Sequence, residues 1–198
     1  MPKPKHIYSR TAIVGLLLVY AASVFAHDGV HAGIMGFADG FAHPFSGVDH
    51  LLAMLGIGLW AAQNRRSALW VLPVAFPLMM VLGAALATIG VGMPIAEPGI
   101  AGSVAVLGLL IAFAVRMPVW GAALLVSLFG MFHGYAHGAE MPEGAAMGMF
   151  GLGFVLATLT LHLAGVAIGL LATHPRALAA VRVGGMGIAA VGMYLLAA

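Results

Sequence analysis

Residues 68–90 read ALWVLPVAFPLMMVLGAALATIG and contain no charged side chain. A helix needs about 20 apolar residues to cross the hydrocarbon core of a bilayer, so this stretch has the length of a membrane span. The whole chain is 63% hydrophobic and 7% charged, with a mean hydropathy of +1.09. Because unpaired backbone groups cannot face lipid, the spanning segments are predicted to be helices. The composition therefore predicts an all-α integral membrane protein in contact with lipid and excludes a water-soluble domain.

Similar apolar stretches recur along the chain, separated by short segments that contain Pro, Gly or charged residues. We expect a six-transmembrane-helix bundle that forms one domain, with spans at about 43–62, 68–90, 99–115, 119–138, 145–172 and 177–197.

The N-terminal segment has the features of a secretory signal peptide. Basic residues come first, an apolar stretch covers residues 12–22, and small residues precede the end of residues 1–26. We expect cleavage after Ala26, with an uncleaved first helix as the alternative. Cleavage would leave residues 27–42 as an external N-terminal segment ahead of a transmembrane domain at 43–198.

The distribution of charge predicts the orientation of the chain. Beyond the signal peptide, the basic residues all fall on one side of the six expected spans: Arg65, Arg66, Arg116, Arg176 and Arg182. Positive charge accumulates on the cytoplasmic side, so both mature termini are expected outside the cytoplasm. We expect a multi-pass protein of a bacterial inner (cytoplasmic) membrane. The dispersed basic residues give no sign of nucleic-acid binding.

Six ionisable residues fall in two short blocks. The block HPFSGVDH contains His43, Asp49 and His50, and the block FHGYAHGAE contains His133, His137 and Glu140. Ionisable side chains are costly inside a bilayer and usually mark a pathway or a binding site. Imidazole and carboxylate are ligands for nickel, cobalt, zinc and iron, and the chain has no cysteine to supply thiolates. The alternative is that these residues only bond neighbouring helices together.

Helical spacing predicts how the two blocks would meet. In a helix that begins at His43, with Pro44 in its first turn, His43 and His50 share one face two turns apart. His133, His137 and Glu140 share one face of the fourth span. The two faces together would form a ladder of metal ligands.

Three further histidines are candidates for secondary metal sites. Cleavage after Ala26 would give His27 a free amine, which could chelate a metal together with the imidazoles of His27 and His31. His162 lies alone in the fifth expected span, where it could bind metal or only bond another helix.

The two blocks, placed on the first and fourth of six spans, closely resemble the HupE/UreJ family. The resemblance covers essentially the whole chain and implies a nickel or cobalt permease that serves hydrogenase or urease maturation. It implies metal-contacting roles for His43, Asp49, His50, His133, His137 and Glu140. The metal would be a transported substrate rather than a permanently bound cofactor, and the protein would not be an enzyme. A homo-oligomer stays open.

Two other functional classes are consistent with the residues themselves. Asp49, His133, His137 and Glu140 could hold a zinc or iron ion for an intramembrane hydrolase or oxidase. The same residues could instead serve a metal sensor or accessory protein without flux. The chain has no phosphate-binding loop of the G-x-x-x-x-G-K-[ST] type, so we expect no ATP hydrolysis.

Overall fold

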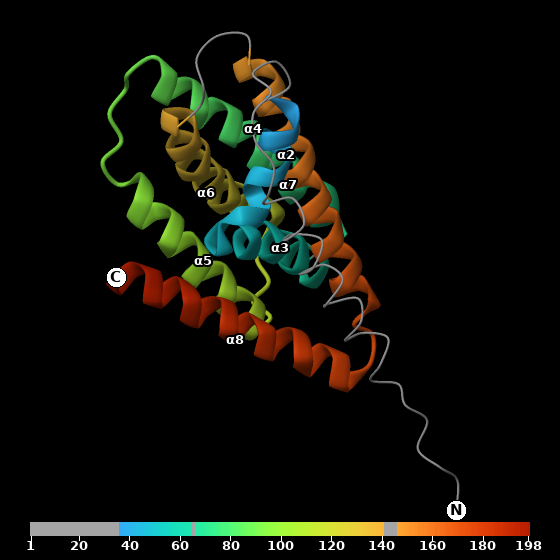
Figure 1. Ribbon diagram of the computed structural model, residues 1–198. Helices are drawn as coiled ribbons and strands as arrows, with labels where there is room; N and C mark the ends of the chain where they lie inside the picture. The colour runs from blue at the N-terminus through green and yellow to red at the C-terminus, as the bar shows by residue number, and fades with distance from the viewer. Residues whose placement is uncertain (1–35, 65, 141–145) are drawn as a thin grey trace, which may run out of the picture. The chain divides into compact units, whose positions relative to one another are not determined.

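The computed structural model describes residues 36–64, 66–140 and 146–198, and within these residues all regular structure is helical. The helices are α2 (Phe37–Ser46), α3 (Val48–Gln63), α4 (Ala68–Thr88), α5 (Ala96–Ala112), α6 (Val119–Glu140), α7 (Ala146–Leu171) and α8 (Pro175–Ala197). Figure 1 shows their order along the chain. Helices α4 to α8 correspond closely to the last five spans expected from the sequence. The expected signal peptide lies outside the described residues.

The first expected span is not one helix, and this prediction was wrong. The chain breaks at Gly47, and the axes of α2 and α3 are bent by 86°. Gly47 has φ −100° and ψ 124°, an extended conformation that stops α2 before α3 begins. Helix α2 begins at Phe37, so Pro44 lies inside a helix rather than in a first turn. The side chains before and after Gly47 fit one helical pattern. The sequence therefore does not show that the helix axis changes direction at Gly47.

Long apolar helices support the membrane assignment. Among the described residues, α4, α6, α7 and α8 are each long and apolar enough to span a bilayer, and the bent pair α2–α3 would make a fifth span. Helix α5 is apolar but shorter, with 17 residues. The count of six spans therefore stays a prediction, whereas an all-helical membrane protein agrees with the structure.

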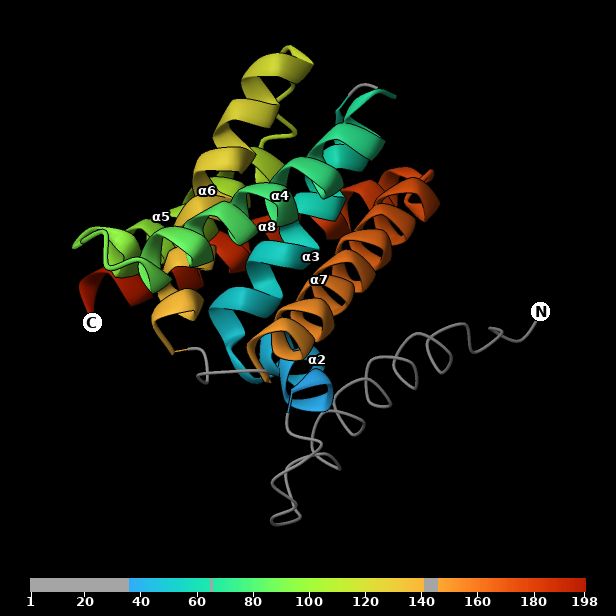
Figure 2. The same ribbon diagram turned by 90° about the horizontal axis from the view of Figure 1, so that it is seen from above.

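Helix α3 lies at the centre of residues 35–198. It contacts α2, α4, α5, α7 and α8, while α4 pairs mainly with α6 and α5 pairs with α8. Figures 1 and 2 show α8 running along α5, and α7 running along α3. Met54, Ile57 and Trp60 of α3 are fully buried among these neighbours. Trp60 also donates a hydrogen bond from Nε1 to the Val115 carbonyl, at 2.9 Å.

Glycines allow the closest helix pairs to form. A Cβ on Gly134 of α6 would overlap the carbonyl oxygen of Met80 in α4. Gly58 of α3 lies equally close to the backbone of α7, beside Gly165. Small residues let helices approach closely in lipid, where no hydrophobic effect drives them together. These contacts fix α6 and α7 against their neighbours and thereby set the positions of the histidines they carry.

Candidate metal-ion site

The bend at Gly47 brings the two ends of the first histidine block together. His43 lies in the last turn of α2, and His50 lies in the first turn of α3. Both imidazole rings contact the ring of His137 from α6, with centroid separations of 4.8 Å for His43 and 4.3 Å for His50. His50 also contacts His133, one turn earlier in α6, at 5.3 Å. We call His43, His50, His133 and His137 the histidine cluster.

The second block thus meets the first as its spacing predicted, although the geometry of the first block differs. His43 and His50 were expected on one face of a continuous helix, and instead they converge across a bend.

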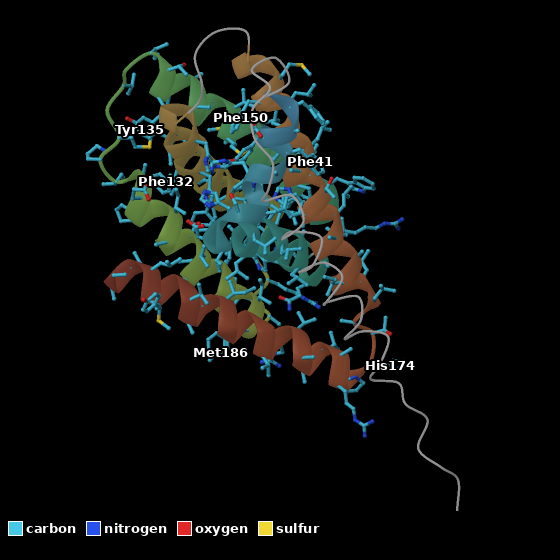
Figure 3. The ribbon with its side chains drawn as sticks, in the orientation of Figure 1. Phe41, Phe132, Tyr135, Phe150, His174 and Met186 are labelled. Carbon is cyan, nitrogen blue, oxygen red and sulfur yellow. The ribbon has the colours of Figure 1, made fainter. Side chains whose placement is uncertain are left out.

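In Figure 3, Phe132 and Tyr135 of α6 lie toward the connection between α4 and α5. The Tyr135 hydroxyl accepts a hydrogen bond from the Met93 backbone N–H at 3.0 Å, which anchors that connection to α6.

Asp49 orients the His50 ring. Its Oδ1 atom lies 2.7 Å from His50 Nδ1 and also accepts the His50 backbone N–H at 2.9 Å. A carboxylate only accepts, so Nδ1 carries the proton and Nε2 of a neutral ring carries the lone pair. His50 Nε2 is buried and has no hydrogen-bond partner within the part of the chain that the structure describes. A carboxylate that fixes the tautomer of a histidine in this way is a common second partner of metal-ligating imidazoles.

A backbone carbonyl fixes the tautomer of His133 in the same way. Its Nδ1 atom donates to the Phe129 carbonyl at 2.9 Å, which leaves Nε2 with the lone pair. The side chain is fully buried, and Nε2 has no hydrogen-bond partner among the described residues. The same holds for both ring nitrogens of His137, although this side chain is also buried. Buried polar atoms are rarely left unpaired, so these nitrogens are suited to bind a ligand.

The cluster does not form a closed cage. Among the side chains that the structure describes, no three of His, Asp or Glu are placed to hold one metal ion together. The histidine rings of α2, α3 and α6 instead contact one another in pairs. Transport sites must release their ion, so several weak sites in succession suit conduction better than one tight cage.

Aromatic residues that no sequence motif marks lie against the cluster. Phe150 and Phe154 of α7 lie 5.6 Å and 5.7 Å from the His43 ring, and Phe154 lies 4.5 Å from His137. Phe76 of α4 lies 5.2 Å from His133. The spacing of Phe150 and Phe154, four residues apart, places them on one face of α7, but apolar aromatics in a span give no further signal of a site.

An open pocket of about 300 Å³ adjoins Asp49. Its wall includes Glu97 and Pro98 of α5 together with Leu195 and Leu196 of α8. Two carboxylates therefore share this pocket next to the cluster and give it a negative charge, which would attract a cation. Glu97 shares this pocket with Asp49 because α5 packs beside α3.

The remaining predicted site residues are not part of the described cluster. Glu140 is the last residue of α6, and its side chain lies outside the described residues, as do His27 and His31. His162 is fully buried in α7, and the ring of Phe76 contacts both His162 and His133.

Comparison with known proteins identifies the family of the chain. A family model described as HupE / UreJ protein matches residues 15–195. The curated Protein HupE of Rhizobium leguminosarum bv. viciae is 38% identical over 189 residues, which cover 96% of this chain and 98% of that protein. The chain belongs to the HupE/UreJ family. No solved structure matches the chain.

Membership removes one of the functional classes left open by the residues. HupE/UreJ proteins are accessory permeases and not enzymes, so the hydrolase or oxidase interpretation is set aside. The family supports, in general terms, a membrane-bound nickel transporter that assists hydrogenase or urease.

Proposed function

We propose that this HupE/UreJ protein carries nickel, or cobalt, across the bacterial inner membrane for hydrogenase or urease maturation. The ion would bind in steps to His43, His50, His133 and His137, with Asp49 and Glu140 supplying carboxylates. The signal peptide, the external mature termini and the six spans belong to the same proposal. The ion is substrate, and no permanently bound cofactor is invoked.

The observation that supports this proposal most strongly is the state of the buried ring nitrogens. Nδ1 of His50 and of His133 is hydrogen-bonded, whereas Nε2 of each is buried and finds no partner in residues 36–64, 66–140 and 146–198. Histidines that only joined helices would use their remaining nitrogen for another hydrogen bond, because an unpaired buried polar atom costs about 1–3 kcal/mol. A passing divalent cation would satisfy these nitrogens in turn.

The membrane potential can drive the proposed transport. An inside-negative potential favours inward movement of a cation by about 2.3 kcal/mol per charge per 100 mV. The carboxylates of Asp49 and Glu97 at the pocket would concentrate the cation there before it reaches the rings.

The deciding experiment is ⁶³Ni²⁺ uptake into proteoliposomes that contain the purified protein under an inside-negative potential. The variants are His50→Ala and His133→Ala, and the control is His174→Ala, an exposed residue that precedes α8. Saturable uptake that is lost in both variants and kept in the control is the expected result. Nickel binding to the wild type without uptake would instead favour a sensor or accessory protein.

A further inference from the structure

Buried polar atoms without a partner also occur on α7, outside the histidine cluster. Thr158 and His162 are both fully buried, and neither Thr158 Oγ1 nor His162 Nε2 has a hydrogen-bond partner among the described residues. They lie four residues apart on one helix, so their side chains share a face. We call these two residues the α7 pair.

Thr158 differs from its neighbour Thr160 in a way that points to a ligand. A helical threonine usually gives its hydroxyl hydrogen to the carbonyl four residues earlier. Thr160 does so, with Oγ1 at 2.8 Å from the Leu156 carbonyl, although it is exposed. Thr158 makes no such bond even though it is buried. Its oxygen lone pairs therefore remain available.

The His162 ring is oriented for the same purpose by α4. Its Nδ1 atom lies 3.3 Å from the Pro73 carbonyl. That carbonyl lacks its usual helical donor because the residue four positions later is Pro77, which has no N–H. Since the carbonyl only accepts, Nδ1 is the donor and Nε2 of the neutral ring keeps the lone pair.

The position of the α7 pair extends the path of the histidine cluster. Phe154, Thr158 and His162 follow one another at four-residue intervals, and Phe154 contacts His137. The rise of a helix places His162 about 12 Å further along α7 than Phe154. The ring of Phe76 contacts both the cluster and the pair, at 5.2 Å from His133 and 5.3 Å from His162.

We propose that Thr158 and His162 form a second binding station for the transported divalent cation, next to the Phe76 ring that also contacts the histidine cluster. Imidazole nitrogen and hydroxyl oxygen would supply two ligands, and water would supply the others. This inference rests on the proposed transport function and adds a deeper step to it. A station with few protein ligands binds weakly, which suits a site that must pass its ion onward.

The test uses Thr158→Val, which keeps the side-chain volume and removes the oxygen, with Thr160→Val as its matched control. A second variant, His162→Gln, is compared with His174→Gln. Each full-length protein is purified and tested for Ni²⁺ binding by equilibrium dialysis and for ⁶³Ni²⁺ uptake in proteoliposomes.

We expect Thr158→Val and His162→Gln to retain nickel at the histidine cluster but to lose the weaker class of bound nickel. Uptake should fall by about tenfold in both, as for other changes to metal-coordinating shells. The two control variants should match the wild type. Wild-type uptake and binding in both Thr158→Val and His162→Gln would overturn the station while leaving the transport proposal intact. If the wild type itself showed no uptake, both proposals would fail together.

Discussion

The Oδ1 atom of Asp49 lies 2.7 Å from Nδ1 of His50, the adjacent residue, and the two residues open helix α3 directly after the bend. Through this pair, the bend in the backbone determines how the His50 ring is presented to the site. The bend places His50 against His137, and the carboxylate then decides which ring nitrogen faces the cluster.

The first prediction concerns this carboxylate. Asp49→Asn keeps the shape of the side chain but removes its charge, so the amide orients the His50 ring less strongly. We expect nickel affinity to fall by about 10- to 100-fold, the usual cost of losing such a partner. Isothermal titration of the purified protein measures this change. Asp39→Asn, an exposed carboxylate on α2, is the control and should bind as the wild type does. Equal affinities of the two variants would contradict the orienting role.

The second prediction concerns Gly47. A Cβ at this position would lie 2.7 Å from His50 Nδ1 and 2.8 Å from Asp49 Oδ1, so it would push the two groups apart. The backbone angles of Gly47 are open to any residue, so Gly47→Ala should not strain the chain. We expect a loss of nickel affinity of about tenfold, with little change in thermal stability.

Comparison of Gly47→Ala with Gly151→Ala tests whether the change at Gly47 lowers nickel affinity without lowering thermal stability. A Cβ at Gly151 would meet no atom within 4 Å. A fall in melting temperature together with affinity would mean that Gly47 serves the fold rather than the alignment of the pair.

The third prediction concerns the contact between α4 and α6. In Gly134→Ala the new methyl group would overlap the Met80 carbonyl, and the two helices would have to separate. Overpacking of this kind costs about 1–3 kcal/mol in free energy of unfolding. Denaturant titration in mixed micelles should show this loss, and uptake should fall because His133 and His137 move with α6. Gly151→Ala is again the control, and equal stability of the two variants would refute the interpretation.

Most of the helices could be predicted because each is a local property of the sequence. Residues 68–90 are uniformly apolar and form α4 over Ala68–Thr88, and the break before α8 falls at the predicted His174-Pro175 region. The helical spacing of His133 and His137 also placed both rings on the side of α6 that meets His50.

What could not be predicted depends on contacts between distant segments. The change of helix axis at Gly47 is not marked in the helical pattern of the sequence. The first span was therefore predicted to be one helix. In the sequence, Phe76 does not differ from the other apolar residues of α4; only the packing of α6 and α7 brings His133 and His162 into contact with its ring. Glu97 likewise became relevant only when α5 packed beside α3 and shared a pocket with Asp49.

The last prediction uses the two prolines of α4. In Pro77→Ala the new backbone N–H can bond to the Pro73 carbonyl and compete with His162 Nδ1 for it. We expect stability to stay the same or to rise, because a helical hydrogen bond is gained, whereas uptake should fall as His162 loses its fixed orientation. Pro73→Ala is the matched control. It restores a backbone N–H that can bond to the Leu69 carbonyl, and it leaves the carbonyl of residue 73 as acceptor for His162. Nitrogen-15 NMR of the labelled histidines would report the His162 tautomer directly. A tautomer that is unchanged in Pro77→Ala would show that the carbonyl freed by Pro77 does not set the orientation of this ring.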